Sequence, residues 1–198
     1  MKRSLFFLAA AAILLASCNS KDSVKSTENN FMSLATDRYA CRSYTDRKVS
    51  DEMLQTILKA GQIAPTAANC QPQRIYVLSS PEVIEKISPV ASTCGAPQAF
   101  LVCYDATKCL INGANGNHPQ GEMDATIVLT HMMLQATELG LDTCWMTWIE
   151  FDRIKEILNL PENIVPVAFM PFGYAKEGTV PGDSHYKRLP IEETVTIL

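Results

Sequence analysis

The chain has 198 residues, of which 47% are hydrophobic and 19% are charged, and its formal net charge is −4. This is the composition of an ordinary globular protein with a single core, and the length leaves little room for two full domains. The acidic balance and the absence of a basic stripe argue against a nucleic-acid-binding protein.

The N-terminus is predicted to be an export signal and not part of the fold. Three residues with two basic side chains precede an apolar run, Ser4 to Ser17, that is shorter than the roughly 20 residues of a membrane-spanning helix. Leu15-Ala16-Ser17-Cys18 resembles a bacterial lipobox, which implies cleavage before Cys18 and attachment of lipid to its sulfur. A plain cleaved signal or a retained anchor is the alternative.

The segment after Cys18 is polar and cannot bury apolar area, so it is predicted to be a flexible tether. The predicted organisation is a lipoprotein signal peptide over 1–17, a tether over 18–30 and one folded domain over 31–198. The mature protein is then expected in the cell envelope, lipid-anchored to a bacterial membrane on its periplasmic or surface side.

Apolar periodicity, capping residues and prolines predict the elements of the domain in chain order. They are a short helix over 31–38, a helix after Ser50 that Pro65 ends, a strand over 74–78, a short helix opened by Ser80-Pro81, a strand over 99–104, an exposed loop over 105–120, a long helix over 122–139, a helix over 151–158, a strand over 165–174 and an extended or irregular tail over 185–198.

These helices and strands mix without regular βαβ alternation, which favours an α+β fold with a sheet packed among helices. The near-continuous apolar run of 99–104 predicts a central strand. The helix over 122–139 is apolar on most of its circumference, which predicts a place in the core or in a subunit interface.

Two basic stretches are candidate phosphate contacts. In RYACR, Arg38 and Arg42 would share one side of a helix, and the planar guanidinium suits a phosphate. The alternative is a solvated face with Asp37 and Asp46 as partners. Near the C-terminus, YKRLPIEE carries Lys187 and Arg188, and its alternative is an exposed basic patch.

Two further stretches could line a cleft. The connection TAANCQPQ, 66–73, carries amide side chains that both donate and accept hydrogen bonds and could read the edge of a heteroaromatic ring. The alternative is turn chemistry and helix capping. In GLDTCWMTW, 140–148, backbone N–H groups could point into the cleft, and the alternative is a buried, Trp-rich core strand.

The cysteines and histidines suggest no metal site. The six cysteines after Cys18 match no CxxC spacing and are predicted to be mostly free, although an exported protein could pair Cys94 with Cys109. The three histidines have no ligand spacing.

Taken in series, six stretches resemble the nitroreductase-like FMN-dependent oxidoreductases over about residues 33–198. They are RYACRSY, APTAANCQPQ, APQAFLVCYD, ATELGLDTCWM, VPVAFMPFGYAKE and KRLPIEE. The resemblance implies a three-layer α+β fold, in which a mixed, mostly antiparallel sheet of four or five strands is flanked by helices. It also implies a homodimer with FMN at the interface.

The resemblance also assigns cofactor-binding positions. It implies that FMN is held by Arg38, Tyr39, Ala40, Arg42, Thr66, Asn69, Gln71, Trp145, Met146, Thr147 and Arg188. Small residues beside Asn69 would leave room for a flat ring. One departure is Ala40, which stands where many members carry Ser, so that only its backbone can contribute.

The implied activity is a two-electron ping-pong reduction of a small aromatic acceptor of the nitroaromatic, quinone or halophenol class. NAD(P)H is the implied electron donor, although an exported enzyme would meet little of it. The flavin carries the electron chemistry, so no catalytic side chain is assigned. The alternatives are a non-catalytic FMN-binding or flavin-scavenging surface lipoprotein, and a degenerate member without flavin, which Ala40 favours.

Overall fold

The computed structural model describes residues 31–198, which form one compact unit. The predicted signal peptide, the tether and the lipidation site Cys18 lie outside the described residues and stay predictions. Within the described residues, no helix has both the length and the apolar character needed to cross a membrane.

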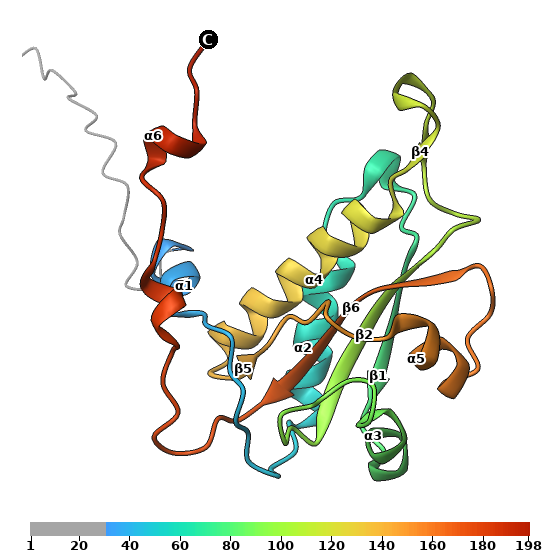
Figure 1. Ribbon diagram of the computed structural model, residues 1–198. Coiled ribbons are helices and arrows are strands. Elements are labelled where there is room, and N and C mark those ends of the chain that lie inside the picture. Colours follow the sequence, from blue (N-terminus) through green and yellow to red (C-terminus); the bar gives the residue numbers. More distant parts are fainter. Residues whose placement is uncertain (1–30) are drawn as a thin grey trace, which may run out of the picture. The chain divides into compact units, whose positions relative to one another are not determined.

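Six α-helices, three short 3-10 helices and six strands make up the described part of the chain (Figure 1). The helices are α1 (Phe31–Asp37), α2 (Asp51–Gln62), α3 (Pro81–Ile87), α4 (Gly121–Glu138), α5 (Phe151–Ile157) and α6 (Ile191–Thr194), with η1 (Ala67–Asn69), η2 (Gly113–Asn115) and η3 (Asp183–Tyr186). The strands are β1 (Gln73–Leu78), β2 (Gln98–Asp105), β3 (Ile111–Asn112), β4 (His118–Pro119), β5 (Asp142–Thr143) and β6 (Ile164–Gly173).

The central sheet has the order β1-β2-β6-β5, and all three of its strand pairs are antiparallel. The predicted central strand is confirmed, because β2 lies between β1 and β6 and is buried along almost its whole length. The one parallel contact is an isolated bridge between Ala40 and Thr143. The sheet is therefore antiparallel, with a parallel element only at this bridge.

Alternate residues of β2 supply two separate cores, which gives the fold its three layers. Phe100 and Val102 pack with α2 and α4 on one face, and Leu101 and Cys103 pack with α3 and α5 on the other. Successive side chains of a strand point to opposite faces, so one apolar run serves both cores. The rings of Phe100 and Phe172 stack at 4.1 Å between centroids and join β2 to β6 within the first core.

The helix boundaries follow from local chemistry. The side chains of Ser50 and Ser80 accept hydrogen bonds from the N–H groups of Met53 and Val83, which caps α2 and α3. Just after the C-terminal end of α4, Gly140 has φ +73°. This angle lies in the left-handed region, where a residue with a side chain would be strained. The predicted start and end of α4 are thus confirmed to within one residue.

Three details differ from the sequence predictions. The loop 105–120 carries the small hairpin β3–β4, and the tail after 182 forms η3 and α6 where an irregular segment was expected. The helix after Ser50 ends at Gln62, three residues before Pro65, and Ile63 beyond its end is 68% exposed. The six cysteines of the described residues are free thiols, so Cys94 and Cys109 are not paired.

Candidate functional site

The segment Arg38–Arg42 is extended and not helical, which corrects the helical interpretation of RYACR. Its middle residue, Ala40, bridges Thr143, and the Cys41 N–H donates to the Thr143 carbonyl at 2.9 Å. In an extended segment, residues i, i+2 and i+4 share a face. Arg38 and Arg42 therefore still lie on one side, and Ala40 lies between them.

These three residues line a pocket of about 200 Å³ together with the C-terminal segment. Arg188 reaches the pocket from beyond η3, where its guanidinium donates to the Lys187 carbonyl at 2.8 Å. The remaining lining residues are Gly182, Ser184 and His185, none of which is acidic. Sequence reasoning missed His185, although its position three residues before Arg188 placed it within reach.

Tyr39 and Cys41 occupy the opposite face of the same segment. They belong to a small cluster with Tyr44 and Ala96, and Cys41 is fully buried. Burial raises the pKa of the Tyr39 hydroxyl, and the nearby Asp142 carboxylate raises it further. The Tyr39 side chain, which the resemblance assigned to the cofactor, thus points away from the arginine pocket and supports the segment from behind.

The segment Trp145–Trp148 runs on from the bridge that holds Arg38–Arg42. Met146 pairs with Phe169 through two backbone hydrogen bonds of 2.8 and 3.0 Å. The next two N–H groups, of Thr147 and Trp148, have no hydrogen-bond partner within 31–198. The buried-strand interpretation of 140–148 holds for its first half, where β5 lies and Leu141, Thr143 and Cys144 are buried, but not for Trp148, which is 99% exposed. Two adjacent donors are left available to an acceptor atom of a ligand.

The connection between α2 and β1 has an unusual backbone. Ala68, Asn69 and Gln71 have φ of 48°, 55° and 50°, in the left-handed region that L-residues seldom adopt. Within the connection, the Thr66 hydroxyl accepts from the Gln71 N–H at 3.1 Å. This fold of the backbone leaves the side chains of Asn69 and Gln71 exposed.

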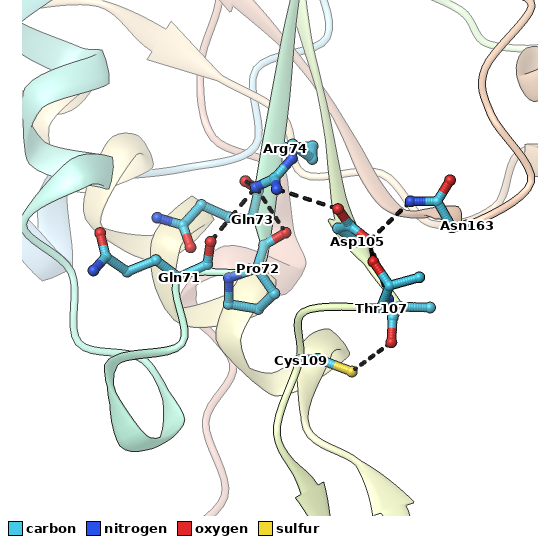
Figure 2. Close-up of polar contacts among 9 residues, drawn as sticks. Gln71, Pro72, Gln73, Arg74, Asp105, Thr107, Cys109 and Asn163 are labelled. Atoms are coloured by element: carbon cyan, nitrogen blue, oxygen red, sulfur yellow. Dashed lines mark hydrogen bonds and ion pairs between the residues drawn. The ribbon is translucent and has the colours of Figure 1, made fainter.

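Both ends of the connection are fixed by charged side chains, which sequence reasoning did not single out. At its start, the Ala67 N–H donates to a carboxylate oxygen of Asp124 in the first turn of α4, at 2.7 Å. At its end, Arg74 donates to the carbonyls of Gln71, Pro72 and Gln73, the last at 2.7 Å, and pairs with Asp105 at 3.2 Å (Figure 2).

Asp105 is itself held by several donors. Its carboxylate accepts from the Thr107 hydroxyl at 2.6 Å, the Thr107 N–H at 3.0 Å and the Asn163 amide at 2.8 Å (Figure 2). The hydrogen bonds from Thr107 and Asn163, together with the Arg74 charge, lower the pKa of the Asp105 carboxyl to about 2. The carboxylate that anchors Arg74 is therefore ionised at all ordinary pH values.

The predicted site residues form two groups at opposite ends of α4. The connection meets α4 at Asp124, whereas Arg38–Arg42 meets β5, which follows the other end of the helix (Figure 1). Glu138 lies 14 residues after Asp124, a separation of about 21 Å at 1.5 Å per residue along the helix. One chain thus brings together Arg38, Ala40, Arg42 and Arg188, next to 145–147, and leaves Thr66, Asn69 and Gln71 apart from them.

Comparison with known proteins identifies the fold. The sequence profile of the nitroreductase family matches residues 35–98 and 91–174. The chain belongs to the nitroreductase family. A crystal structure of a nitroreductase family protein from Clostridium difficile 630 superposes with a TM-score of 0.79 at 42% identity, and covers 85% of this chain and 98% of that one.

Two curated relatives extend the comparison. A protein of Archaeoglobus fulgidus, assigned as an NADH dehydrogenase/NAD(P)H nitroreductase, is 32% identical over 149 residues, which are 71% of this chain and 82% of the relative. The FMN reductase [NAD(P)H] of Bacillus subtilis is 29% identical over 184 residues, which are 83% of this chain and 72% of the relative. Membership in the nitroreductase family confirms the predicted α+β fold and the prediction that this chain is an oxidoreductase.

Proposed function

We propose that this nitroreductase family member binds FMN and uses NAD(P)H to reduce a small aromatic acceptor in a two-electron ping-pong reaction. The observation that carries the proposal is the arginine pocket, in which Arg38, Arg42 and Arg188 converge from segments about 150 residues apart in sequence. Like charges repel each other, so three guanidinium groups around one pocket favour an anionic ligand.

The chemistry of the pocket fits the phosphate of FMN. Guanidinium groups form paired, charge-assisted hydrogen bonds with phosphate oxygens, and hydrogen bonds to charged groups contribute roughly 1.5–3 kcal/mol each. Arg38, Arg42 and Arg188 would hold the phosphate, and Ala40 between them leaves room at the pocket wall.

FMN, when bound, supplies the electron transfer from donor to acceptor. The chain contributes binding and preorganised dipoles, because the N–H groups of Thr147 and Trp148 have no partner within the described residues and can donate to an acceptor atom of the ring. Burial raises the pKa of the Cys41 and Cys144 thiols beside the pocket, so they stay neutral at physiological pH. Neither thiol is therefore a nucleophile at that pH.

The separation of the two groups of site residues supports a homodimer. A two-fold axis can bring the connection of one subunit to the arginine pocket of its partner. One complete site then combines the connection of one subunit with the arginine pocket of the other. The C-terminal segment with α6 extends away from the sheet, and several of its apolar side chains are exposed (Figure 1). They are Leu189, Ile191, Val195, Ile197 and Leu198. Burial of this segment against a second subunit would remove its apolar surface from water.

The test is the colour and the chemistry of the purified protein. Mature protein refolded with excess FMN should be yellow after desalting, and NADH or NADPH should bleach it without dithionite. A nitroaromatic, a quinone and a halophenol, added separately, should restore the colour at different rates. A colourless protein would contradict FMN binding. A yellow protein bleached only by dithionite would instead support a non-catalytic FMN-binding protein.

We further propose that the mature chain is lipid-anchored in the cell envelope through Cys18. The proposal is supported by the apolar run that ends at Leu15-Ala16-Ser17-Cys18. Metabolic labelling with a fatty acid should mark the wild-type protein and leave Cys18→Ala unlabelled. Equal labelling of the two proteins would contradict it. NADH or NADPH is then the donor that reduces the purified protein in the assay, whereas in the cell the anchored enzyme would draw electrons from a donor available outside the cytoplasm.

A further inference from the structure

The connection 66–73 is held in a conformation that its own residues disfavour. Ala68 and Gln71 adopt left-handed backbone angles, which are strained for residues with a Cβ, and Asn69 between them is the one type that tolerates such angles well. Strained backbone persists where the surrounding structure determines it, and it gathers at functional sites. The hydrogen bond between the Thr66 hydroxyl and the Gln71 N–H holds it from within, and two further contacts hold it from outside.

Asp124 is the first anchor. Its carboxylate is 2% exposed, and one oxygen accepts from the Ala67 N–H at 2.7 Å, immediately before the left-handed residues. The other oxygen is buried and has no hydrogen-bond partner within 31–198. A buried, half-satisfied carboxylate lowers the stability of a fold. Its presence here is explained if the hydrogen bond to Ala67 serves the connection and not the core.

Arg74 with Asp105 is the second anchor. The guanidinium gathers the carbonyls of Gln71, Pro72 and Gln73, so it fixes the chain directly after the last left-handed residue. Asp105 holds Arg74 from β2, and Thr107 and Asn163 hold Asp105 (Figure 2). The connection is thus tied to α4 at one end and to the sheet at the other.

The anchored connection presents amide groups to solvent. The Asn69 side chain makes no hydrogen bond to any residue of the described domain, and Gln71 makes only a long one, at 3.4 Å, to the Asn69 carbonyl. Both amides are free to pair with a ligand. A binding segment that is already ordered avoids the loss of conformational freedom that ligand binding otherwise requires.

We propose that Asp124 and the Arg74–Asp105 pair are positioning residues, which hold the connection in its left-handed conformation before FMN binds. Neither anchor needs to touch FMN. The proposal rests on the proposed FMN binding and on the proposed homodimer, which brings the connection of one subunit to the arginine pocket of the other. Without an anchor the connection is competent in only a fraction of molecules, and the apparent dissociation constant for FMN rises by the inverse of that fraction.

This scheme predicts a rescue that a purely structural role of Asp124 would not produce. Ala68→Gly removes the steric penalty at φ 48°, so it stabilises the competent conformation. In the wild type that conformation already dominates, and Ala68→Gly should change FMN affinity by less than about twofold. In Asp124→Ala the affinity should fall about tenfold, and adding Ala68→Gly should restore at least about threefold of it.

The experiment measures FMN dissociation constants by fluorescence quenching on the mature protein, with hydrogen exchange of residues 66–73 in the FMN-free state as an independent readout. Exchange should quicken in Asp124→Ala and slow again in the double variant. Asn159→Gly, at another left-handed residue outside the connection (φ 49°), is the matched control and should restore nothing. If Asp124→Ala fails to fold, Asp124→Asn retains a neutral acceptor and should weaken FMN binding about threefold.

The outcomes separate this proposal from the proposed function. A wild-type protein that binds no FMN would overturn FMN binding, while the exchange data would still test the anchors. Normal FMN affinity and unchanged exchange in the Asp124 variants would overturn the anchors and leave FMN binding intact. Equal rescue by Asn159→Gly would overturn the link to the connection.

Discussion

The two halves of the candidate site are built in opposite ways. The arginine pocket consists of long, partly exposed side chains on extended or irregular backbone, drawn from both ends of the domain. The connection 66–73 consists of short side chains on a strained backbone that buried charges fix in place. The pocket would bind its ligand through charge, and a charge interaction tolerates loose geometry. The connection would bind its ligand through directional hydrogen bonds, which require precise geometry.

The largest effect is expected at Thr147, which belongs to neither half. Thr147→Pro removes an N–H that has no partner in the described domain and keeps the extended backbone of Met146. Loss of one preorganised donor lowers turnover by roughly 10²–10³-fold in well-studied sites. We expect turnover at saturating FMN to fall by about 10²-fold, with flavin still bound, by steady-state assay and absorbance. Thr56→Val, at an exposed threonine of α2 outside both halves of the site, is the control for a general effect of losing a threonine.

That prediction assigns rate to backbone dipoles and affinity to the arginines. If Thr147→Pro instead released FMN and kept its turnover when FMN was added in excess, the segment would be a binding element like the arginine pocket. The segment 145–148 would then belong with the arginine pocket as a binding element, and no part of the site would be assigned to rate.

The second effect concerns the charge-based half. Arg42→Ala should weaken FMN binding by about 1.5–3 kcal/mol, which is roughly a 10- to 150-fold rise in the dissociation constant. Turnover at saturating FMN should change little. Wild-type affinity should also fall as salt is raised from 0.05 to about 0.5 M, because the arginines are partly exposed and their charges are screened.

Arg153→Ala is the matched control, because Arg153 is an exposed arginine paired only with Glu156 on α5. It should leave FMN affinity and its salt dependence unchanged. A salt dependence that persisted undiminished in Arg42→Ala would indicate that the pocket does not hold the phosphate.

The arginine pocket was predictable from sequence because a spacing of four places Arg38 and Arg42 on one side of a helix or of an extended segment. Residue 40 lies on the same side as Arg38 and Arg42 only if the segment is extended. A pattern of five residues is too short to distinguish the helical conformation from the extended one. The strands β1, β2 and β6 and the helix α4 were predictable because their apolar patterns are long, whereas the two-residue strand β5 carries no such pattern. The role of Asp124 was not, because an acidic residue in the first turn of a helix usually reads as a partner of the helix dipole. Its burial against Ala67 is a tertiary contact.

The third prediction tests the anchored half through pH. The pKa of Asp105 is lowered to about 2 in the folded state, below its ordinary value of 3.8. A lowered folded pKa contributes stability that is complete above the unfolded pKa and disappears as pH falls through the folded pKa. The contribution of Asp105 should therefore be lost between about pH 4 and pH 2.

Thermal unfolding of FMN-free protein at pH 5, 4, 3 and 2 measures this loss. Asp105→Asn should unfold at a lower temperature than wild type at pH 5, and the difference between them should shrink toward pH 2. Glu156→Gln, which breaks only the exposed pair with Arg153, should follow the wild-type curve. Parallel curves for Asp105→Asn and wild type would show that the Arg74–Asp105 pair contributes nothing to the fold.

The smallest effect is expected at two buried thiols beside the arginine pocket, Cys41 and Cys144, which should take no part in the reaction. Cys41 and Cys144 are buried on either side of the bridge between Ala40 and Thr143, and burial raises the pKa of both thiols. A neutral thiol is a poor nucleophile.

Cys144→Ala should lower the free energy of unfolding by about 1 kcal/mol through lost packing and leave turnover within about twofold at saturating FMN. Cys109→Ala, at a partly exposed thiol outside both halves of the site, separates a general sensitivity to cysteine loss from one local to the pocket. If Cys144→Ala lost turnover by tenfold or more while it kept its FMN, a side chain and not the backbone at Thr147 would carry the chemistry, and the arginine half of the site would have to be both the binding and the reacting half.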